Sequence, residues 1–376
     1  MRKKWAIWIV CLVAFYGAQA QPLSFNFRRV TTAEGLNMGT ATAICEDKYG
    51  YIWIGTPGGL NRFDGYGTRV FEHRFRDSTS LMPSGVRYLY CDTEGRLWVS
   101  FMNGLMEYDY STGRFKNYPL GAPTWITDII EARPGFLYIA TSDGLVKLQK
   151  STGAVTLFDS LSTVGRGWRS QVWDMAQHRD KLYLATRSGV SVFDMQTERW
   201  QPVTLPKEME HRAIGRIAIS PSGDLWMCSR EDGAPIWRTT TRFDSWKAYD
   251  ALSRSESGQA NILNDLLFDR QGRLWISSFY NGIALYDPTT DQLRKSRIEP
   301  WMPNGMLAPY LGRLYQDRKG QIWGESLRGV CYFHPDNPVA GFYRRNGGQR
   351  IDAAELADDN PGDVCEGCFS FQPVGT

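Results

Sequence analysis

One pattern of glycine, aliphatic and aromatic residues recurs seven times along the 376-residue chain and limits its fold more than any other feature. In each copy an aliphatic and an aromatic residue follow a turn, and a second glycine, an aliphatic and a further aromatic come after them. The key aromatics are Trp53, Trp98, Tyr138, Tyr183, Trp226, Trp275 and Trp323, with spacings of 45, 40, 45, 43, 49 and 48 residues. This period is typical of a four-stranded propeller blade. The sequence therefore predicts an all-β chain whose residues 21–345 form a single seven-bladed β-propeller with four-stranded blades.

The residue types inside one repeat favour four short strands, A to D. Strand A is apolar and ends near an aspartate such as Asp47, and Gly50 supplies the positive φ that a tight A–B turn needs. Strand B carries the key aromatic, which we interpret as packing between blades, and a small residue such as Gly55 two positions later. We expect the aspartate to cap its own hairpin. Either Leu23–Val30 or Val339–Arg345 could supply the outer strand that closes the ring.

The two ends of the chain differ from the repeats. Three basic residues at positions 2–4, an apolar run over 5–16 and an Ala-x-Ala sequence predict a signal peptide over 1–20, cleaved after Ala20, and a periplasmic protein. The run is too short to span a membrane, and no later segment is apolar enough, so we expect no membrane span in the mature chain. Residues 346–376 are expected to be irregular or the start of an incomplete further repeat.

Charge and cysteine content exclude several classes of function. Lys and Arg (43) exceed Asp and Glu (40) by the three basic residues of the leader, so the mature body is neutral and nucleic-acid binding is not expected. Four cysteines in strand-like contexts are expected to be free thiols: Cys45, Cys91, Cys228 and Cys331. The spacing of Cys365 and Cys368 leaves a local disulfide open, because a zinc site would need further ligands.

The repeat resembles that of the two-component regulator propeller family, and the first copy, with Glu34-Gly35-Leu36-Asn37 followed by residues 44–64, matches its pattern best. The resemblance covers residues 27–344. It implies a periplasmic sensor of the hybrid two-component systems of Bacteroidetes, many of which recognise oligosaccharides. In that family two propellers precede an immunoglobulin-like module, a membrane helix, a kinase, a receiver and a DNA-binding region. None of these output modules follows residue 345, so a stand-alone propeller and a truncated sensor both stay open, as do a membrane sensor kinase or a second copy as partner.

The order of strands places the D–A and B–C loops on one face of a propeller. Aromatic rings stack on sugars, and Arg and Asn side chains bind hydroxyl, carboxylate or sulfate groups. The residues that we predict to bind an oligosaccharide there are Trp125, Arg169, Arg187, Arg212, Arg230, Phe279, Tyr280, Asn281, Tyr310 and Arg328.

The sequence thus predicts a sensor that binds a glycan fragment without turnover and needs no cofactor or metal. A protein-interaction scaffold is the first alternative, since propeller faces also suit peptides. A carbohydrate-active enzyme is the least expected, because the four His residues fall on different faces and Glu231 and Asp232 are adjacent in one loop. No nucleophile elbow or phosphate-binding glycine loop accompanies them.

Overall fold

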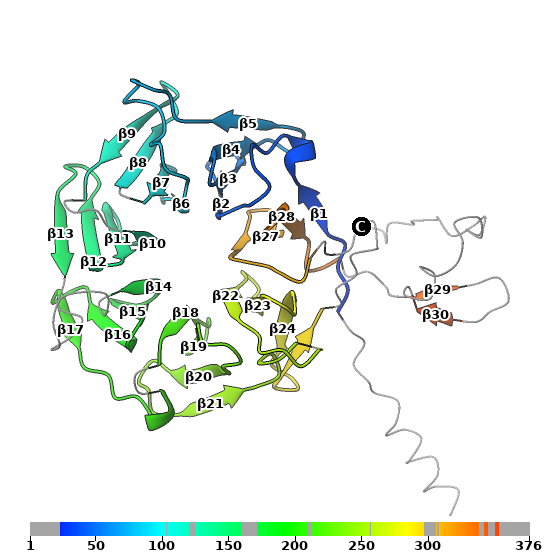
Figure 1. The fold of residues 1–376 in the computed structure, drawn as a ribbon. Helices are drawn as coiled ribbons and strands as arrows, with labels where there is room; N and C mark the ends of the chain where they lie inside the picture. Colours follow the sequence, from blue (N-terminus) through cyan, green and yellow to red (C-terminus); the bar gives the residue numbers. More distant parts are fainter. Residues whose placement is uncertain are drawn as a thin grey trace, which may run out of the picture.

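Seven antiparallel four-stranded sheets stand around a common axis (Figure 1). The computed structural model describes residues 23–102, 104–120, 125–158, 171–209, 212–255, 257–296, 306, 308–337, 342–344 and 350–352. In every blade strand A lies nearest the axis and strand D at the outside. The predicted seven-bladed propeller is confirmed. The predicted leader and the tail from 353 onward, with Cys365 and Cys368, lie outside the described residues.

Six blades take their four strands from consecutive chain. Blade 1 comprises β2 (Ala43–Glu46), β3 (Ile52–Thr56), β4 (Gly59–Phe63) and β5 (Thr68–Phe71). Blade 2 comprises β6 (Tyr88–Cys91), β7 (Leu97–Phe101), β8 (Gly104–Asp109) and β9 (Arg114–Tyr118). Blade 3 comprises β10 (Ile126–Arg133), β11 (Phe136–Thr141), β12 (Gly144–Gln149) and β13 (Val155–Phe158). Blade 4 comprises β14 (Val172–His178), β15 (Lys181–Thr186), β16 (Gly189–Asp194) and β17 (Arg199–Gln201). Blade 5 comprises β18 (Ile214–Ile219), β19 (Asp224–Ser229), β20 (Ile236–Thr240) and β21 (Trp246–Tyr249). Blade 6 comprises β22 (Leu263–Phe268), β23 (Leu274–Ser278), β24 (Ile283–Asp287) and β25 (Gln292–Lys295). Short 3₁₀ turns lie at Thr32–Glu34 and Lys207–Met209.

Blade 7 joins the two ends of the propeller. Its strands A to C are β26 (Leu314–Gln316), β27 (Ile322–Ser326) and β28 (Gly329–Phe333), and its outer strand is β1 (Arg28–Val30), which pairs antiparallel with β28. The other candidate for closure pairs elsewhere, because β29 (Phe342–Arg344) forms a two-stranded ribbon with β30 (Arg350–Asp352). The N-terminal segment therefore closes the ring, and a non-covalent contact holds the first and last blades together.

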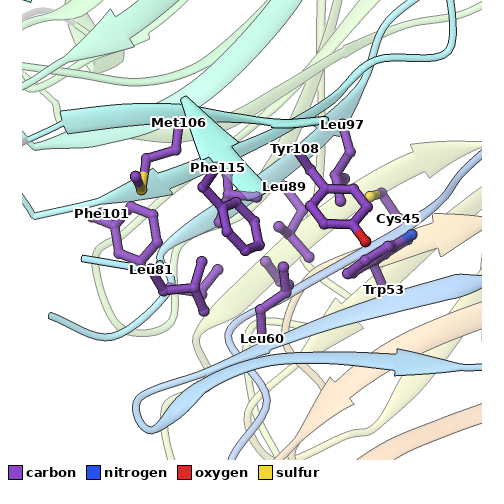
Figure 2. Packing of buried hydrophobic residues seen from close by; sticks show 13 residues of the cluster. Cys45, Trp53, Leu60, Leu81, Leu89, Leu97, Phe101, Met106, Tyr108 and Phe115 are labelled. Carbon is purple, nitrogen blue, oxygen red and sulfur yellow. The ribbon is translucent and has the colours of Figure 1, made fainter. Parts of the chain in front are cut away.

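The repeated aromatics pack between blades, as the sequence predicts. Trp53 is fully buried against Tyr108 of the next blade, at 5.1 Å between ring centroids (Figure 2). The predicted aspartate cap is also present, since Asp47 Oδ1 accepts the backbone N–H groups of Tyr49 and Tyr51. Its second oxygen accepts the Trp53 indole N–H at 2.7 Å. The same Asp-to-Trp bond recurs in blades 2, 6 and 7. The four cysteines of the blades are free thiols, as expected.

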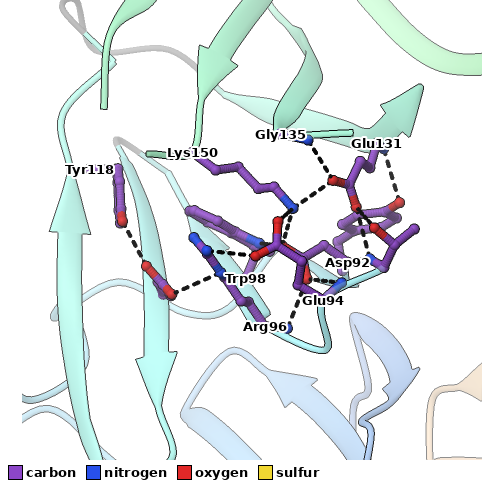
Figure 3. A network of polar contacts seen from close by, with 11 residues as sticks. Asp92, Glu94, Arg96, Trp98, Tyr118, Glu131, Gly135 and Lys150 are labelled. Carbon is purple, nitrogen blue, oxygen red and sulfur yellow. Dashed lines mark hydrogen bonds and ion pairs between the residues drawn. The ribbon is translucent and has the colours of Figure 1, made fainter. Parts of the chain in front are cut away.

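A buried lysine crosses the interface between blades 2 and 3 on the A–B side. Lys150 Nζ lies 2.9 Å from Asp92, 2.6 Å from Glu94 and 2.5 Å from Glu131 (Figure 3). Burial opposes ionisation of Glu131, but hydrogen bonds from Lys150 and Thr93 lower its pKa to about 2. These charges are paired rather than free for chemistry, so we assign the cluster to the stability of the blade interface.

In neighbouring blades, the residue at the position of Lys150 also matches the residue that it meets in the preceding blade. Tyr110 of blade 2 donates its hydroxyl to Asp47 of blade 1 at 3.1 Å. In blade 4 the position holds Met195, which is buried and packs in one cluster with Ala132. Ala132 stands where other repeats have the aspartate. A polar group is therefore placed where it meets a carboxylate, and an apolar one where the carboxylate is missing.

Candidate functional site

Strand A of each blade places one residue at an equivalent position around the axis. Each of these seven residues precedes the key aromatic of its blade by ten positions, or by nine in blade 4. They are Ala43, Tyr88, Asp128, Asp174, Arg216, Asp265 and Arg313. Charged side chains thus occupy five of seven places on otherwise apolar strands. We call these seven residues the axial ring.

The aspartates of the axial ring bind the free edge of the next inner strand. An innermost strand has unpaired N–H groups, which need an acceptor. Asp128 Oδ2 accepts the N–H of Met175 at 2.9 Å, and Asp265 Oδ2 accepts that of Leu314 at 2.8 Å. Asp174 serves blade 5 in the same way. One oxygen of each carboxylate is therefore structural, and its partner oxygen is left for other contacts.

Arg313 reaches across the axis from blade 7 to the opposite side of the ring. Its guanidinium donates to the Thr127 carbonyl at 2.6 Å and lies 3.9 Å from Asp128, both in blade 3. It also stacks on the Tyr88 ring of blade 2, at 4.6 Å from the centroid. A second arginine, Arg216, donates to the Asn264 carbonyl at 2.7 Å and lies 3.3 Å from Asp265. Each of these two arginines therefore lies beside an aspartate of the axial ring.

A cavity of about 670 Å³ lies along the axis below the ring. One end includes Asp128, Asp174, Asp265, Arg313 and Glu325. Its walls are mainly apolar residues of the inner strands, and its other end lies among the A–B turns with Lys48, Glu94 and Arg318.

Three carboxyl groups that line this cavity have raised pKa values. Burial and the Asp174 carboxylate raise the pKa of Asp128, against the attraction of Arg313. Burial likewise raises the pKa of Asp265, and it raises the pKa of Glu325 to about 7. Carboxyl groups with such shifts occur at functional sites as well as in structural networks.

The sequence-predicted binding residues lie on the opposite side of the axial ring. Nine of the ten fall on B–C or D–A loops, while Arg169 lies outside the described residues. Phe279, Tyr280 and Tyr310 form an aromatic group, with Phe279 at 4.8 Å from Tyr280 and 5.3 Å from Tyr310 between centroids. Trp125 is 52% exposed and has the Arg87 guanidinium over its ring.

Arg230 is a cation of this face that lies on an aromatic ring. Part of its side chain is exposed, and its guanidinium lies 4.9 Å from the centroid of the buried Trp173 ring. Partial burial of the guanidinium and the nearby guanidinium groups of Arg216 and Arg313 lower the pKa of Arg230. No described carboxylate forms an ion pair with it. Three cations therefore gather where the B–C loops surround the axis.

Other predicted residues of this face have structural contacts. Arg212 pairs with Glu231 at 2.8 Å. Asn281 is buried and donates to the Arg254 carbonyl. Arg187 and Arg328 are exposed in the B–C turns of blades 4 and 7. The structure thus brings the three aromatics together, but it does not join all the predicted residues in one pocket.

Sequence reasoning missed most of the axial ring, although a signal for it was present. Aligning the seven repeats on their aromatics reveals a column of charged residues in strand A. A second column, two residues after the aromatic, holds small residues in blades 1 to 6 and Glu325 in blade 7. Reading down these columns would have found both sets.

A family model and a curated protein each match part of this chain. Residues 35–58, in blade 1, match the family model described as two component regulator propeller. The resemblance seen in the sequence is confirmed. A curated histidine kinase of Formosa agariphila is 38% identical over 63 residues, which are 17% of this chain and 5% of the kinase.

Solved structures share the fold. The extracellular domain of a protein assigned to a hybrid two-component system of B. thetaiotaomicron superimposes with a TM-score of 0.69 at 18% identity, covering 86% of this chain and 44% of that one. A second such domain from the same organism gives 0.67 at 16% identity, covering 82% and 40%. A virginiamycin B lyase from Staphylococcus aureus gives 0.64 at 13% identity, covering 82% and 98%. The chain spans less than half of each of these two extracellular domains.

In the described part of the chain, no helix is long and apolar enough to cross a membrane. No group of three or more His, Cys, Asp or Glu side chains among those residues is placed to hold a metal ion.

Proposed function

We propose that this chain is a periplasmic ligand-sensing propeller. We further propose that the face formed by its B–C and D–A loops, which we call the B–C face, binds an oligosaccharide without cleaving it. The observation that carries the proposal is the position of Arg230, whose guanidinium lies on the Trp173 ring near Arg216 and Arg313. An exposed arginine fixed on an aromatic ring suits a carboxylate or sulfate group, which it can bind through two parallel hydrogen bonds.

Aromatic side chains of the same face support a sugar ligand. Tyr280, Phe279 and Tyr310 are half-buried, and Trp125 offers an exposed ring. The faces of such rings pack against the apolar faces of sugars, while their edges and hydroxyls stay polar. Together with Arg230 they favour an acidic oligosaccharide over a neutral one.

The similarity to extracellular domains of two-component proteins supports a role in sensing and a location outside the cytoplasm. On this proposal, binding is passed to a membrane sensor kinase or to a second copy of the chain. A cross-linking experiment with and without the ligand would identify which partner is present.

The test is a binding screen of residues 21–376 against neutral, uronic-acid and sulfated oligosaccharides, with calorimetry and product analysis of each hit. The decisive variant is Arg230→Ala, and its matched control is Arg242→Ala, which removes a highly exposed arginine from the turn between β20 and β21 on the other face. Loss of a charge-assisted contact should weaken binding about tenfold to a hundredfold, while the control should bind as the natural protein does.

Two results would contradict the proposal. Cleavage of the ligand would make the protein an enzyme. Equal affinity of Arg230→Ala and the natural protein for every acidic glycan that binds would remove the B–C face from the site.

A further inference from the structure

The outer strand of blade 1 has an open edge at its centre. β5 is the last strand of its sheet and pairs with β4 alone (Figure 1). The Asp64 N–H donates to the Gly67 carbonyl at the turn of this hairpin. Because hydrogen-bonded and non-hydrogen-bonded pairs alternate along an antiparallel ladder, the N–H and C=O groups of Val70 point away from β4. They bond to no described backbone group, so this edge can accept a further strand.

A groove of about 820 Å³ runs along this edge. It is lined by the consecutive residues Arg69, Val70 and Phe71. Since neighbouring side chains of a strand point to opposite faces, a groove that touches all three follows the edge of the strand. Its other wall comes from residues 72–80 and from residues 112–115 of blade 2. We call it the lateral groove, and its volume lies in the range of ligand pockets, about 300–1,000 Å³.

Exposed apolar side chains accompany the open edge. Val70 is 38% exposed, and Phe75, in the segment that follows β5, is 82% exposed. The same segment covers the outer strand of blade 2, where the Thr79 carbonyl accepts the Phe115 N–H. The edge of β5 at Val70 has no such cover among the described residues. An open strand edge with exposed apolar side chains is a template for pairing with another chain.

The charges of the lateral groove favour an acidic partner. Arg69, Arg74 and Arg114 line it, and all three are exposed. None of them forms an ion pair with the carboxylate of a described residue. Glu72 and Asp77 also line the groove, but Asp77 already accepts hydrogen bonds within its own turn. Guanidinium groups without a partner bind carboxylates through charge-assisted hydrogen bonds.

Two arginines of blade 1 also repel one another beside this groove. Arg69 on β5 lies directly opposite Arg62 on β4, and like charges in this arrangement destabilise a sheet. The Arg69 guanidinium lies 5.0 Å from the centroid of the Phe71 ring, and that of Arg62 lies 4.4 Å from that of Tyr51. Phe71 packs on Phe115 of blade 2, so Arg69 lies on the side of β5 that faces blade 2. A bound carboxylate there would relieve the repulsion.

We propose that the lateral groove binds an extended acidic segment of a partner protein, which pairs with β5 at Val70 as a fifth strand of blade 1. In such strand addition, backbone hydrogen bonds supply affinity and alternate side chains supply specificity. The partner places carboxylates beside Arg69 and apolar side chains beside Val70. This site lies at the outside of blades 1 and 2 and does not depend on glycan binding at the B–C face.

The test is calorimetry at low ionic strength with three short peptides that are blocked at both ends. The first alternates glutamate and valine, and the second alternates lysine and valine. The third alternates glutamate and proline, so it keeps the charge but lacks the N–H groups that strand pairing needs. The glutamate–valine peptide should bind at least about tenfold more tightly than either of the others.

Two variants locate the peptide on β5. Val70→Pro removes the outward N–H without removing a bond to β4, and Arg69→Ala removes one cation. Each should weaken binding of the glutamate–valine peptide about tenfold. The matched control is Arg199→Ala, which removes an exposed arginine from β17, the outer strand of blade 4, and should bind as the natural protein does. Because Arg69→Ala changes an exposed side chain, the conclusion does not depend on the folding of Val70→Pro.

Four results would overturn the proposal. The first is no binding of the glutamate–valine peptide, or equal binding of all three peptides. The second is an unchanged affinity in both β5 variants. The third is binding of dextran sulfate that is lost in Arg69→Ala but kept in Val70→Pro, which would assign the groove to an anionic glycan. The fourth is a dimer of the protein alone that Val70→Pro dissociates in sedimentation, which would show that a second copy covers β5.

Failure at the lateral groove is distinguishable from failure at the B–C face. Binding of an acidic oligosaccharide at the B–C face should persist in both Arg69→Ala and Val70→Pro. Binding of the glutamate–valine peptide should persist in Arg230→Ala, because Arg230 lies in blade 5.

Discussion

Replacing Glu325 by glutamine should stabilise the propeller in alkaline solution and leave its stability unchanged in acid. The carboxyl group is 7% exposed, and burial raises its pKa from 4.5 to about 7 in the folded protein. The unfolded chain therefore releases this proton first as the pH rises, so ionisation favours unfolding between pH 4.5 and about 7. Below pH 4.5 the group is neutral in both states and contributes no difference.

The size of the effect follows from the shift. A rise of about 2.5 in the pKa corresponds to about 3.5 kcal/mol at pH values well above 7, since each pKa unit is worth about 1.4 kcal/mol. Glutamine removes this penalty because it does not ionise, and it keeps an oxygen that can accept the Arg313 N–H. Attraction by Arg313 and Arg216 and repulsion by Asp265 are already contained in the shifted value.

Urea unfolding of both proteins at pH 4.5 and pH 8.5 measures the effect. We expect the variant to be more stable by about 3.5 kcal/mol at pH 8.5 and equal within about 0.5 kcal/mol at pH 4.5. The control Glu231→Gln, at an exposed ion pair with Arg212, should change stability by less than about 1 kcal/mol at either pH. A Glu325→Gln protein no more stable than the natural one at pH 8.5 would refute the reasoning.

Three further substitutions test the packing of the ring. Lys150→Met should lower the free energy of unfolding by about 3–5 kcal/mol at pH 7, because it leaves buried carboxylates without a partner. This loss of stability should shrink as the pH falls from 4.5 toward 2, where Glu131 becomes protonated in both the folded and the unfolded state. An unchanged loss of stability in acid would contradict this. Trp323→Phe removes the indole N–H from Asp317 and should cost about 1–3 kcal/mol in urea unfolding, against no cost if the bond were incidental. Phe27→Ala, in the N-terminal closing segment, should lower the unfolding free energy by about 3–5 kcal/mol, whereas a change under 1 kcal/mol would show that the ring does not need this segment.

The blade architecture could be predicted because it repeats. A single glycine and tryptophan carry little information, but Trp53 and Trp275 stand in the same local pattern, and the same A–B turn recurs around them. Ring closure could not be decided in this way. Both candidate strands are short and lack a pattern of their own, and the choice depends on pairing between β1 and β28, which are 300 residues apart in the chain.

The centre of the propeller was harder to predict than its blades. Arg313 contacts the Thr127 carbonyl, which lies 186 residues away in the chain. The carboxylate of Asp128 accepts the Met175 N–H of the next blade. Such contacts arise only when the ring closes. The exception at Glu325, by contrast, was visible in the aligned repeats.

The proposed binding of an acidic oligosaccharide is best tested by calorimetric titration of the natural protein and of Arg230→Ala. The ligand is an acidic oligosaccharide selected by the screen, and the recovered sugar is then analysed. We expect saturable binding, an intact ligand and a loss of affinity of about tenfold or more in the variant. Binding that is unaffected by the substitution, or a sugar recovered in pieces, would contradict a sensor whose B–C face reads an acidic glycan.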